Sequence, residues 1–282
     1  MSTTYDHLKG RTAVITGGSG VLCQAMAKEL ARYGVNIVIL NRTEEKGQKV
    51  AKEIEKFGVK AIAIACNVVD LESVKRAEQQ VLATFGSCDI LINGAGGGHP
   101  GGNTTNEKLK LGDIGNPDIS TLFDMTVDGF GDVLDLNVLG TWIPTQIFSK
   151  HMINRTGATI INISSMAAPR PATKVPAYSA AKAAIDNITK WLAVYLSEAG
   201  IRVNAIAPGF FLTEQNKNLL VEADGSLTER SQKIIAHTPM GRFGNPEELI
   251  GTLMWLVNEQ TSGFVTGITV PIDGGFMAYS GV

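Results

Sequence analysis

Short runs of apolar, β-branched residues alternate with longer amphipathic stretches along most of the chain. The runs are continuously apolar, which is typical of strands buried on both faces of a parallel sheet. The stretches between them have helical spacing and are long enough to cross from one strand to the next. We therefore expect an α/β fold, a doubly wound sheet of about seven parallel strands flanked by helices. The expected strands are residues 12–16, 35–40, 60–66, 89–93, 158–164, 201–207 and 267–272, and the expected helices lie near 21–33, 43–57, 71–85, 127–153, 176–199 and 246–259.

Two segments interrupt this alternation, at about residues 96–131 and 210–239. Both follow the carboxyl ends of expected strands, which is the edge where open α/β sheets bind ligands. We expect them to be loops that wall a substrate site, the alternative being loops without a role in binding. The chain has no linker, low-complexity tract or internal repeat, so residues 1–282 are expected to form a single domain.

Composition narrows the function classes. Hydrophobic residues make up 44% of the 282 residues and charged residues 18%, an ordinary balance for a globular protein. A net charge of −2 and a pI of about 6.1 argue against nucleic acid or a membrane surface as partners. No apolar run approaches a membrane span, and the first residues lack a signal peptide's apolar region, so a cytoplasmic protein is expected.

Cysteine and histidine usage gives no metal site. Cys23, Cys66 and Cys88 are odd in number and lack CxxC spacing, which indicates buried free thiols. The four histidines show neither HxxxH nor HxH spacing.

Candidate chemistry lies at Tyr178 and Lys182, one turn apart on an expected helix that Pro176 can begin and Gly200 can end. A neighbouring ammonium stabilises phenolate, so we expect Lys182 to lower the pKa of Tyr178. Ser165 follows an apolar run and is expected at the mouth of a strand, where it can hydrogen-bond a carbonyl. A Tyr and a Lys at this spacing also occur by chance, but the strand-end Ser favours proton transfer to an alcohol oxygen.

A glycine turn joins the first expected strand to the first helix. Gly17, Gly18 and Gly20 allow close approach of a pyrophosphate, which the helix N-terminus would attract. Asn41 stands at the end of the second strand, where an acidic residue would bind the ribose of NAD, and Arg42 could pair with the 2′-phosphate of NADP. The sequence favours NADP(H), with NAD(H) as the alternative.

Ordered motifs over the whole chain extend this pattern. They are TGGSG after the first strand, NGAG at 93–96, Asn137 in LDLNVLGT, Ser165 in NISSM, YSAAK at 178–182, IRVNAIAPG at 201–209, Thr213, and VTGITVPIDGG at 265–275. Together they resemble the short-chain dehydrogenase/reductase family, which implies a Rossmann-like fold and an NAD(P)-dependent enzyme acting on CH–OH groups.

The resemblance also implies residue roles. Tyr178 would be the acid/base, Ser165 would orient the substrate oxygen, Lys182 would hold the nicotinamide ribose, and Asn137 would position a water in a proton relay. Asn93 would brace the sheet, while Pro208, Gly209 and Thr213 would seat the carboxamide. The cofactor contacts implied are Gly17, Gly18, Ser19, Gly20, Val21, Leu22, Asn41, Arg42, Asn67, Val68, Asn93, Gly94, Ala95, Gly96, Tyr178, Lys182, Pro208, Gly209, Phe211 and Thr213.

Four positions depart from the family pattern. Val21 and Cys23 replace the last two glycines of TGxxxGxG, Asn67 replaces a common Asp, and Gly94 replaces the second Asn of NNAG. These changes leave the catalytic residues intact and bear on cofactor geometry and preference. The new side chains on the first helix are expected either to narrow the pyrophosphate turn or to pack against the sheet.

Longer segments, among them LINGAGGGHP, APGFFLTEQN and DGGFMAYSGV, resemble the D-mannonate oxidoreductase (fructuronate reductase) branch of the family. This implies reversible reduction of D-fructuronate, a keto sugar acid, to D-mannonate. We expect Arg170 or Lys174 to bind the carboxylate and His99 or Gln215 to contact hydroxyls, against the alternative that each is a solvated loop residue.

Other readings stay open. The substrate could be another ketone, of the 5-ketogluconate type or a 3-oxoacyl group, although polar residues at 96–131 argue against an acyl chain. A non-catalytic nucleotide-binding regulator is a further alternative, which the intact Ser, Tyr and Lys disfavour. Family members commonly form tetramers, so a homotetramer or homodimer is expected, with Trp191, Val194 and Tyr195 in either a subunit contact or the core.

Overall fold

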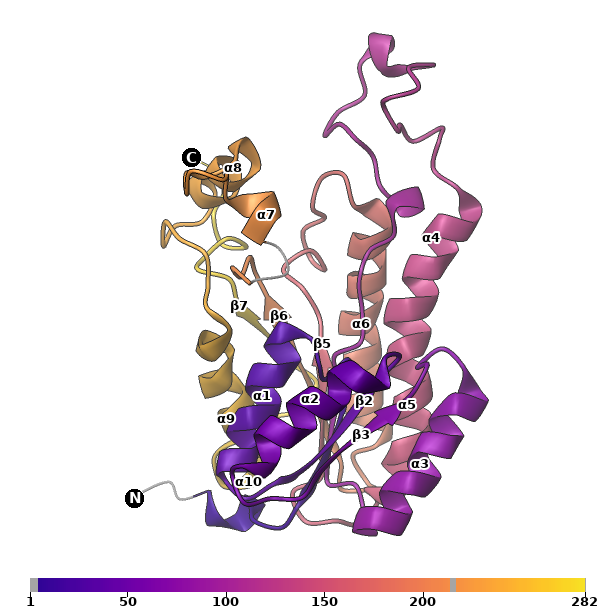
Figure 1. Ribbon diagram of the computed structural model, residues 1–282, viewed down its shortest axis with the longest axis vertical. Coiled ribbons are helices and arrows are strands. Elements are labelled where there is room, and N and C mark those ends of the chain that lie inside the picture. The colour runs from indigo at the N-terminus through magenta and orange to yellow at the C-terminus, as the bar shows by residue number, and fades with distance from the viewer. Residues whose placement is uncertain (1–4, 214–216, 282) are drawn as a thin grey trace.

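Seven parallel strands form one sheet in the order β3-β2-β1-β4-β5-β6-β7 (Figure 1). The structure is a computed structural model, and it describes residues 5–213 and 217–281. Every strand lies within two residues of its expected bounds, because continuous apolar runs identify buried strands well. The strands are β1 Thr12–Thr16, β2 Asn36–Asn41, β3 Ala61–Ala65, β4 Ile90–Asn93, β5 Thr159–Ile163, β6 Arg202–Pro208 and β7 Thr269–Ile272.

Helices cover both faces of the sheet. One face packs against α1, α2 and α9, and the other against α3, α5 and α6. Successive strand residues serve opposite faces, as Val14 and Ile15 of β1 do. The helices are α1 Val21–Arg32, α2 Glu44–Glu55, α3 Leu71–Phe85, α4 Val127–Leu134, α5 Gly140–Phe148, α6 Pro176–Tyr195, α7 Lys217–Leu220, α8 Glu229–Ala236, α9 Ile250–Val257 and α10 Glu259–Ser262.

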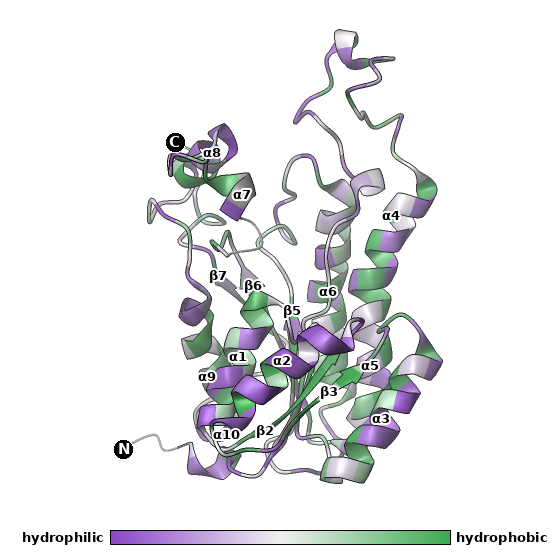
Figure 2. Cartoon of the chain, viewed as in Figure 1, coloured by the Kyte–Doolittle hydropathy of each residue, from purple (hydrophilic) through white to green (hydrophobic). Residues whose placement is uncertain are grey.

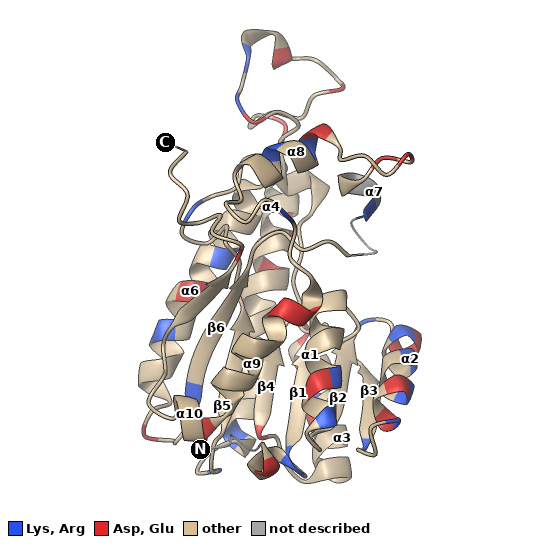
Figure 3. Ribbon diagram, turned by 90° about the vertical axis from the view of Figure 1, so that its left-hand side faces the viewer, with Lys and Arg blue, Asp and Glu red and all other residues tan. Residues whose placement is uncertain are grey.

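The distribution of polar side chains follows these layers. Figure 2 shows β2 and β3 hydrophobic along their length, whereas α2 and α3 carry hydrophilic residues as well. Charged residues gather on helices such as α2 and on the loops, and they are sparse on the strands (Figure 3). In the part of the chain that the structure describes, no helix combines the length and the apolar character needed to cross a membrane.

Three expected helices differ from the structure. The single helix expected at 127–153 is interrupted by a π-helical turn, Asp135–Leu139, between α4 and α5. The helix expected at 246–259 is a 3₁₀ turn, Pro246–Leu249, followed by α9 and then α10. The helix expected at 176–199 ends at Tyr195. Apolar spacing does not reveal these changes, because one extra residue or a tighter turn barely alters it.

Both interrupting segments lie beyond the carboxyl ends of the strands. Residues 103–126 project from that edge as an extended arm, seen at the top of Figure 1. A backbone hydrogen bond from Thr105 to Ser120 (2.8 Å) closes its base, and Asn106 donates to Asp113 (3.0 Å) within it. The second segment contains α7 and α8, which the sequence did not predict. A Thr228 side chain that accepts from the Ser231 amide begins α8 (3.2 Å).

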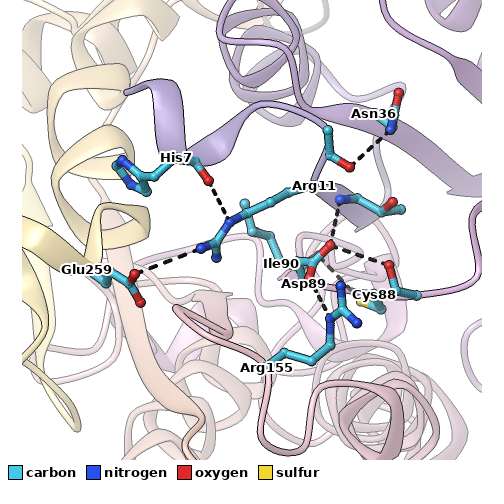
Figure 4. Close-up of polar contacts among 11 residues, drawn as sticks. His7, Arg11, Asn36, Cys88, Asp89, Ile90, Arg155 and Glu259 are labelled. Atoms are coloured by element: carbon cyan, nitrogen blue, oxygen red, sulfur yellow. Dashed lines mark hydrogen bonds and ion pairs between the residues drawn. The ribbon is translucent and has the colours of Figure 1, made fainter. Parts of the chain in front are cut away.

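The amino edge of the sheet holds a buried polar network (Figure 4). The Asp89 carboxylate, 3% exposed, accepts from the Thr12 amide (2.8 Å) and from Arg155 Nε (2.6 Å). These contacts join the start of β1 to the start of β4 and to the turn before β5. The three cysteines are buried and free, as expected. Within residues 5–213 and 217–281, no group of His, Cys, Asp and Glu could hold a metal ion.

Candidate active site at the carboxyl edge of the sheet

Asn137 lies fully buried in the π-helical turn between α4 and α5. Its Nδ2 donates to the carbonyls of Gly97 and Val133 (both 2.8 Å), and its Oδ1 accepts from the Gly97 amide (3.3 Å). The extra residue of a π turn redirects a side chain, which is why such turns recur at functional sites. Here it fixes the glycine segment that follows β4.

Gly96 lies where that segment meets Lys182. A Cβ at Gly96 would lie 2.6 Å from Asn137 Oδ1 and 3.3 Å from Lys182 Nζ. A side chain cannot be accommodated there without moving one of these two residues. The buried Lys182 ammonium donates to the Ile163 carbonyl at the end of β5 (2.7 Å). Burial lowers the pKa of Lys182 to about 8, against the opposing influence of Cys23 and Asp186.

Tyr178 and Ser165 lie close together beside this lysine. Ser165 follows the end of β5, and Tyr178 lies in the first turn of α6 with its ring centroid 5.5 Å from Lys182 Nζ. Burial raises the pKa of Tyr178, and the Ser165 side chain lowers it to a lesser extent. The expectation that Lys182 lowers the pKa of Tyr178 is therefore wrong for this structure, because desolvation of the phenol dominates.

A cleft of about 550 Å³ opens next to these residues at the carboxyl ends of β1 to β4. Seven of the expected cofactor residues line it: Gly17, Asn41, Arg42, Asn67, Val68, Ala95 and Gly96. Sequence reasoning missed Asp132, Asp135 and Leu136, which line it from α4 and the π turn. Their only signal was a position inside an expected helix next to Asn137.

The turns after β1 and β4 are locked together beneath the cleft. Gly17 has a left-handed backbone (φ +64°), and a Cβ there would lie 2.9 Å from Ala95 Cα. The Thr16 hydroxyl accepts from the amides of Gly94 and Ala95 (both 3.1 Å). Gly18 is packed as tightly, since its Cβ would lie 2.8 Å from Ile39 Cδ1.

Two departures from the family pattern, Cys23 and Gly94, are complementary in space. A Cβ at Gly94 would overlap the sulfur of Cys23, which reaches this turn from the first turn of α1. The side chain absent after β4 thus makes room for the one added on α1. Cys23 therefore packs against the turn after β4. Val21 and Leu22 begin the helix beside it, with Gly20 as the N-cap and Ser19 before it.

Asn41 links the end of β2 to two neighbouring turns. Its Oδ1 accepts from the Ser19 amide (3.3 Å), and its Nδ2 donates to the Thr43 carbonyl (2.8 Å). The next residue, Arg42, is exposed at the rim of the cleft. Asn93 is buried and donates to Thr145 Oγ1 (2.8 Å) and Asn162 Oδ1 (2.9 Å), joining β4 to α5 and β5.

The turn after β6 lies against β7. The Gly209 amide donates to the Ile272 carbonyl (2.9 Å), and a Cβ at Gly209 would lie 2.6 Å from Asp273 Cα. Pro208 is the last residue of β6, and the Phe211 ring packs against Gly244. Thr213 is the last described residue before residues 214–216.

The candidate substrate residues are spread over several loops. Arg170 Nη1 donates to carbonyls of the C-terminal segment, at 2.6 Å for Tyr279 and 3.2 Å for Met277. Lys174 is exposed, with a left-handed backbone (φ +70°). His99 lines the same cleft as Arg42, and its Nδ1 accepts from the Gly101 amide (3.1 Å). Gln215 lies outside the described residues.

Comparison with known proteins places this site in a family. Residues 11–223 match the family model of the short chain dehydrogenases, so the chain belongs to that family and is an oxidoreductase acting on CH–OH groups. An uncharacterized oxidoreductase of Bacillus subtilis (strain 168) is 56% identical over 282 residues, the whole of both chains. An uncharacterized oxidoreductase of Haemophilus influenzae is 51% identical over 283 residues, covering 100% of this chain and 99% of the relative.

A solved structure extends the comparison to three dimensions. A protein from Haemophilus influenza, provisionally named a D-mannonate oxidoreductase and crystallised with bound NAD, superposes with a TM-score of 0.94. It is 51% identical to this chain, and the match covers 98% of each chain. The Rossmann-like fold expected from the sequence is confirmed.

Proposed function

We propose that the protein interconverts a keto sugar acid and its alcohol with a nicotinamide cofactor, the pair being D-fructuronate and D-mannonate. The observation that carries this proposal is the placement of Tyr178 and Ser165 beside buried Lys182, next to a glycine-lined cleft. The Haemophilus protein of the same fold, at 51% identity, supports both the cofactor and the substrate class.

The cleft fits a dinucleotide in size and in donors. Its volume of about 550 Å³ lies within the range of small-molecule sites. Gly17 and Gly96 bring backbone to its surface, and the amino end of α1 follows the glycine turn. NAD bound to the Haemophilus protein argues that NAD(H) is accepted, while Arg42 at the rim would add binding for the 2′-phosphate of NADP(H).

Once bound, the nicotinamide would donate or accept the hydride. Tyr178 would give its phenolic proton to the oxygen of the reduced carbonyl, and the Ser165 hydroxyl would orient that oxygen. The raised pKa keeps Tyr178 protonated at neutral pH, which suits reduction. The reverse oxidation needs the phenolate and should speed up as the pH rises. Lys182 would hold the ribose, with Asn137 fixing the segment that contains Gly96 and positioning a water for proton relay.

The substrate carboxylate needs a cation at the mouth of the site. Arg170 Nη1 already donates to C-terminal carbonyls, so we assign the carboxylate to Lys174. His99 and Gln215 remain proposed hydroxyl contacts. A second candidate, reduction of another ketone, shares all the catalytic residues and differs only at these positions.

A kinetic panel tests the proposal. NADH and NADPH oxidation would be followed with D-fructuronate, D-tagaturonate, 5-ketogluconate and a 3-oxoacyl thioester. We expect D-fructuronate to give the highest kcat/KM, and Tyr178→Phe to lower kcat by about 10²- to 10⁴-fold while NADH binding persists. Full turnover by Tyr178→Phe would contradict the mechanism, and a better thioester substrate would contradict the sugar-acid assignment.

We also propose a homotetramer, with a homodimer as the alternative. Trp191, Val194 and Tyr195 on α6 are 50%, 77% and 69% exposed, so they do not pack in the core of one chain. Exposed aromatic side chains grouped on one helix are typical of subunit contacts. Light scattering of the native protein and of Tyr195→Glu measures the assembly; an unchanged mass for the variant speaks against this face.

A further inference from the structure

The C-terminal segment, residues 273–281, folds back over the ends of the strands. The Asp273 carboxylate accepts from the amides of Gly275 (2.9 Å) and Met277 (2.8 Å), which turns the chain directly after β7. The Gly274 carbonyl accepts from the Met240 amide, close after α8 (3.1 Å). Figure 1 shows the C-terminus beside α8, above the carboxyl ends of the strands.

Arg170 joins this segment to the loop that carries the catalytic serine. It lies between Ser165 and Tyr178, and its Nη1 donates to the carbonyls of Tyr279 (2.6 Å), Met277 (3.2 Å) and Phe276 (3.5 Å). The planar guanidinium suits such convergent carbonyls, and its charge strengthens each bond. These hydrogen bonds bring residues more than one hundred positions apart together at the edge that holds the site.

Two aromatic contacts hold the same segment on its other side. The Phe276 ring meets Phe210, in the turn after β6, edge to face at 5.4 Å. The Tyr279 ring meets His237, directly after α8, at 6.1 Å. The segment also lines a cleft of about 360 Å³ together with Phe210 and Met240. It is thus packed between the loop after Ser165 and the residues around α8.

We infer that the C-terminal segment is a third wall of the substrate site, and that Arg170 is the positioning residue that holds it there. This inference rests on the proposed function and deepens it. Arg170 then affects the substrate indirectly, by holding this segment in place. Lys174, four residues further along the same loop, binds the substrate carboxylate.

A double-mutant cycle separates the wall from direct carboxylate binding. The variants are Arg170→Ala, a chain ending at Gly275, and the two combined. We expect each single change to raise KM for D-fructuronate by about tenfold, because one or two charge-assisted hydrogen bonds are lost. The combined variant should show no further increase in KM. If Arg170→Ala raises KM as much in the shortened chain as in the full one, the inference is overturned.

A neutral ketose as a second substrate distinguishes loss of the wall from loss of a carboxylate ligand. D-Fructose carries a hydroxymethyl group in place of the carboxylate of D-fructuronate. Loss of a wall lowers kcat/KM for both sugars, whereas loss of a carboxylate ligand affects only the acid. We expect Arg170→Ala to affect both sugars, and Lys174→Ala to affect D-fructuronate alone; the reverse pattern overturns the inference.

A substrate-free measurement distinguishes failure of this inference from failure of the proposed function. Hydrogen exchange of the amides in residues 276–281 reports whether the segment is held. We expect faster exchange in Arg170→Ala and native exchange in Lys174→Ala, with NADH binding and unfolding temperature unchanged in both. Equal exchange in the two variants overturns the role of Arg170, whatever the substrate proves to be.

Discussion

The amino and carboxyl edges of the sheet both bury polar side chains, but they use them differently. At the amino edge, the Asp89 carboxylate accepts hydrogen bonds from a strand amide and from a guanidinium, so both of its partners belong to this chain. At the carboxyl edge, Lys182 and Asn137 lie beside a cleft lined by glycine backbone. The first arrangement stabilises the fold, whereas the second holds a lysine whose burial opposes its charge.

This contrast separates stability from activity. A buried group whose partners all belong to the chain should affect stability when removed and leave catalysis alone. A buried group kept for a ligand should do the opposite, because functional sites often retain locally unfavourable residues. Substitutions at the two edges therefore test the comparison directly.

Among the substitutions that compare the two edges, Lys182→Met should give the largest effect. We expect kcat/KM to fall by about 10²- to 10³-fold, the range for one catalytic electrostatic donor, with an unfolding temperature at pH 7 equal to or above that of the wild type. The sign follows from the pKa of Lys182, about 8 in the folded chain against 10.5 for the free group. Between these two pH values the unfolded wild type binds more protons than the folded wild type, so the free energy of unfolding of the wild type increases from pH 8 to 10.5. The variant has no ammonium at this position, so its free energy of unfolding should not show this increase.

Thermal unfolding from pH 7 to 10.5 and steady-state kinetics measure both effects. Lys182→Arg, which keeps the charge, is the control and should stay as inactive as the methionine variant because the bulkier head group displaces Gly96. A variant that loses stability at pH 7 and keeps its activity would reverse the comparison.

Asp89→Ala should lower stability and leave activity unchanged. Removing the carboxylate leaves the Thr12 amide and Arg155 without their acceptor, and we expect a loss of about 2 to 3 kcal/mol in the free energy of unfolding. Chemical denaturation measures it. Kinetics at a temperature where the variant is folded should give native KM and kcat. Asp89→Asn, which keeps an acceptor for Thr12, should lose less; an equal loss would show that the backbone contact is unimportant.

The exchange between Cys23 and Gly94 predicts a coupling of intermediate size. Gly94→Ala should weaken NADH binding and stability, because its Cβ meets the Cys23 sulfur. Adding Cys23→Ala removes the sulfur and should recover about 1 to 2 kcal/mol, as neighbouring residues are non-additive. Recovery should be partial, since the same Cβ also lies 2.9 Å from the Thr16 carbonyl. Additive losses in NADH titrations and unfolding curves would show that the two positions are independent.

How much the sequence predicts differs between these features. Continuous apolar runs predicted each described strand, because a strand that is buried on both faces must consist almost entirely of apolar residues. The π turn at Asn137 was not predictable, because one inserted residue leaves the apolar spacing almost unchanged. The raised pKa of Tyr178 was missed because sequence spacing shows a nearby cation and does not show how deeply the phenol is buried. The polar helix α8 was missed although Thr228 gave a usable N-cap signal.

The hydrogen bonds of Arg170 show why the partners of a loop cation are hard to predict from the sequence. A cation between Ser165 and Tyr178 suggests a carboxylate ligand, but the carbonyls it meets belong to the far end of the chain. Only the fold brings that end to Arg170. The same limit applies to Cys23 and Gly94, which lie on different elements and are complementary only in space.

Arg42→Ala should give the smallest effect and concerns the outer rim of the carboxyl edge. Arg42 is exposed, so an ion pair with a 2′-phosphate would be worth at most about 1 kcal/mol, and we expect KM for NADPH to rise by about two- to fivefold. KM for NADH should stay unchanged, because that cofactor lacks the phosphate. Lys46→Ala, an exposed cation on α2, is the matched control and should alter neither constant. Since screening weakens exposed pairs, the difference between the two cofactors should shrink as salt is raised. Equal changes for NADPH and NADH would mean that Arg42 shapes the rim without reading the phosphate, and the preference for NADP(H) would then have no support at this position.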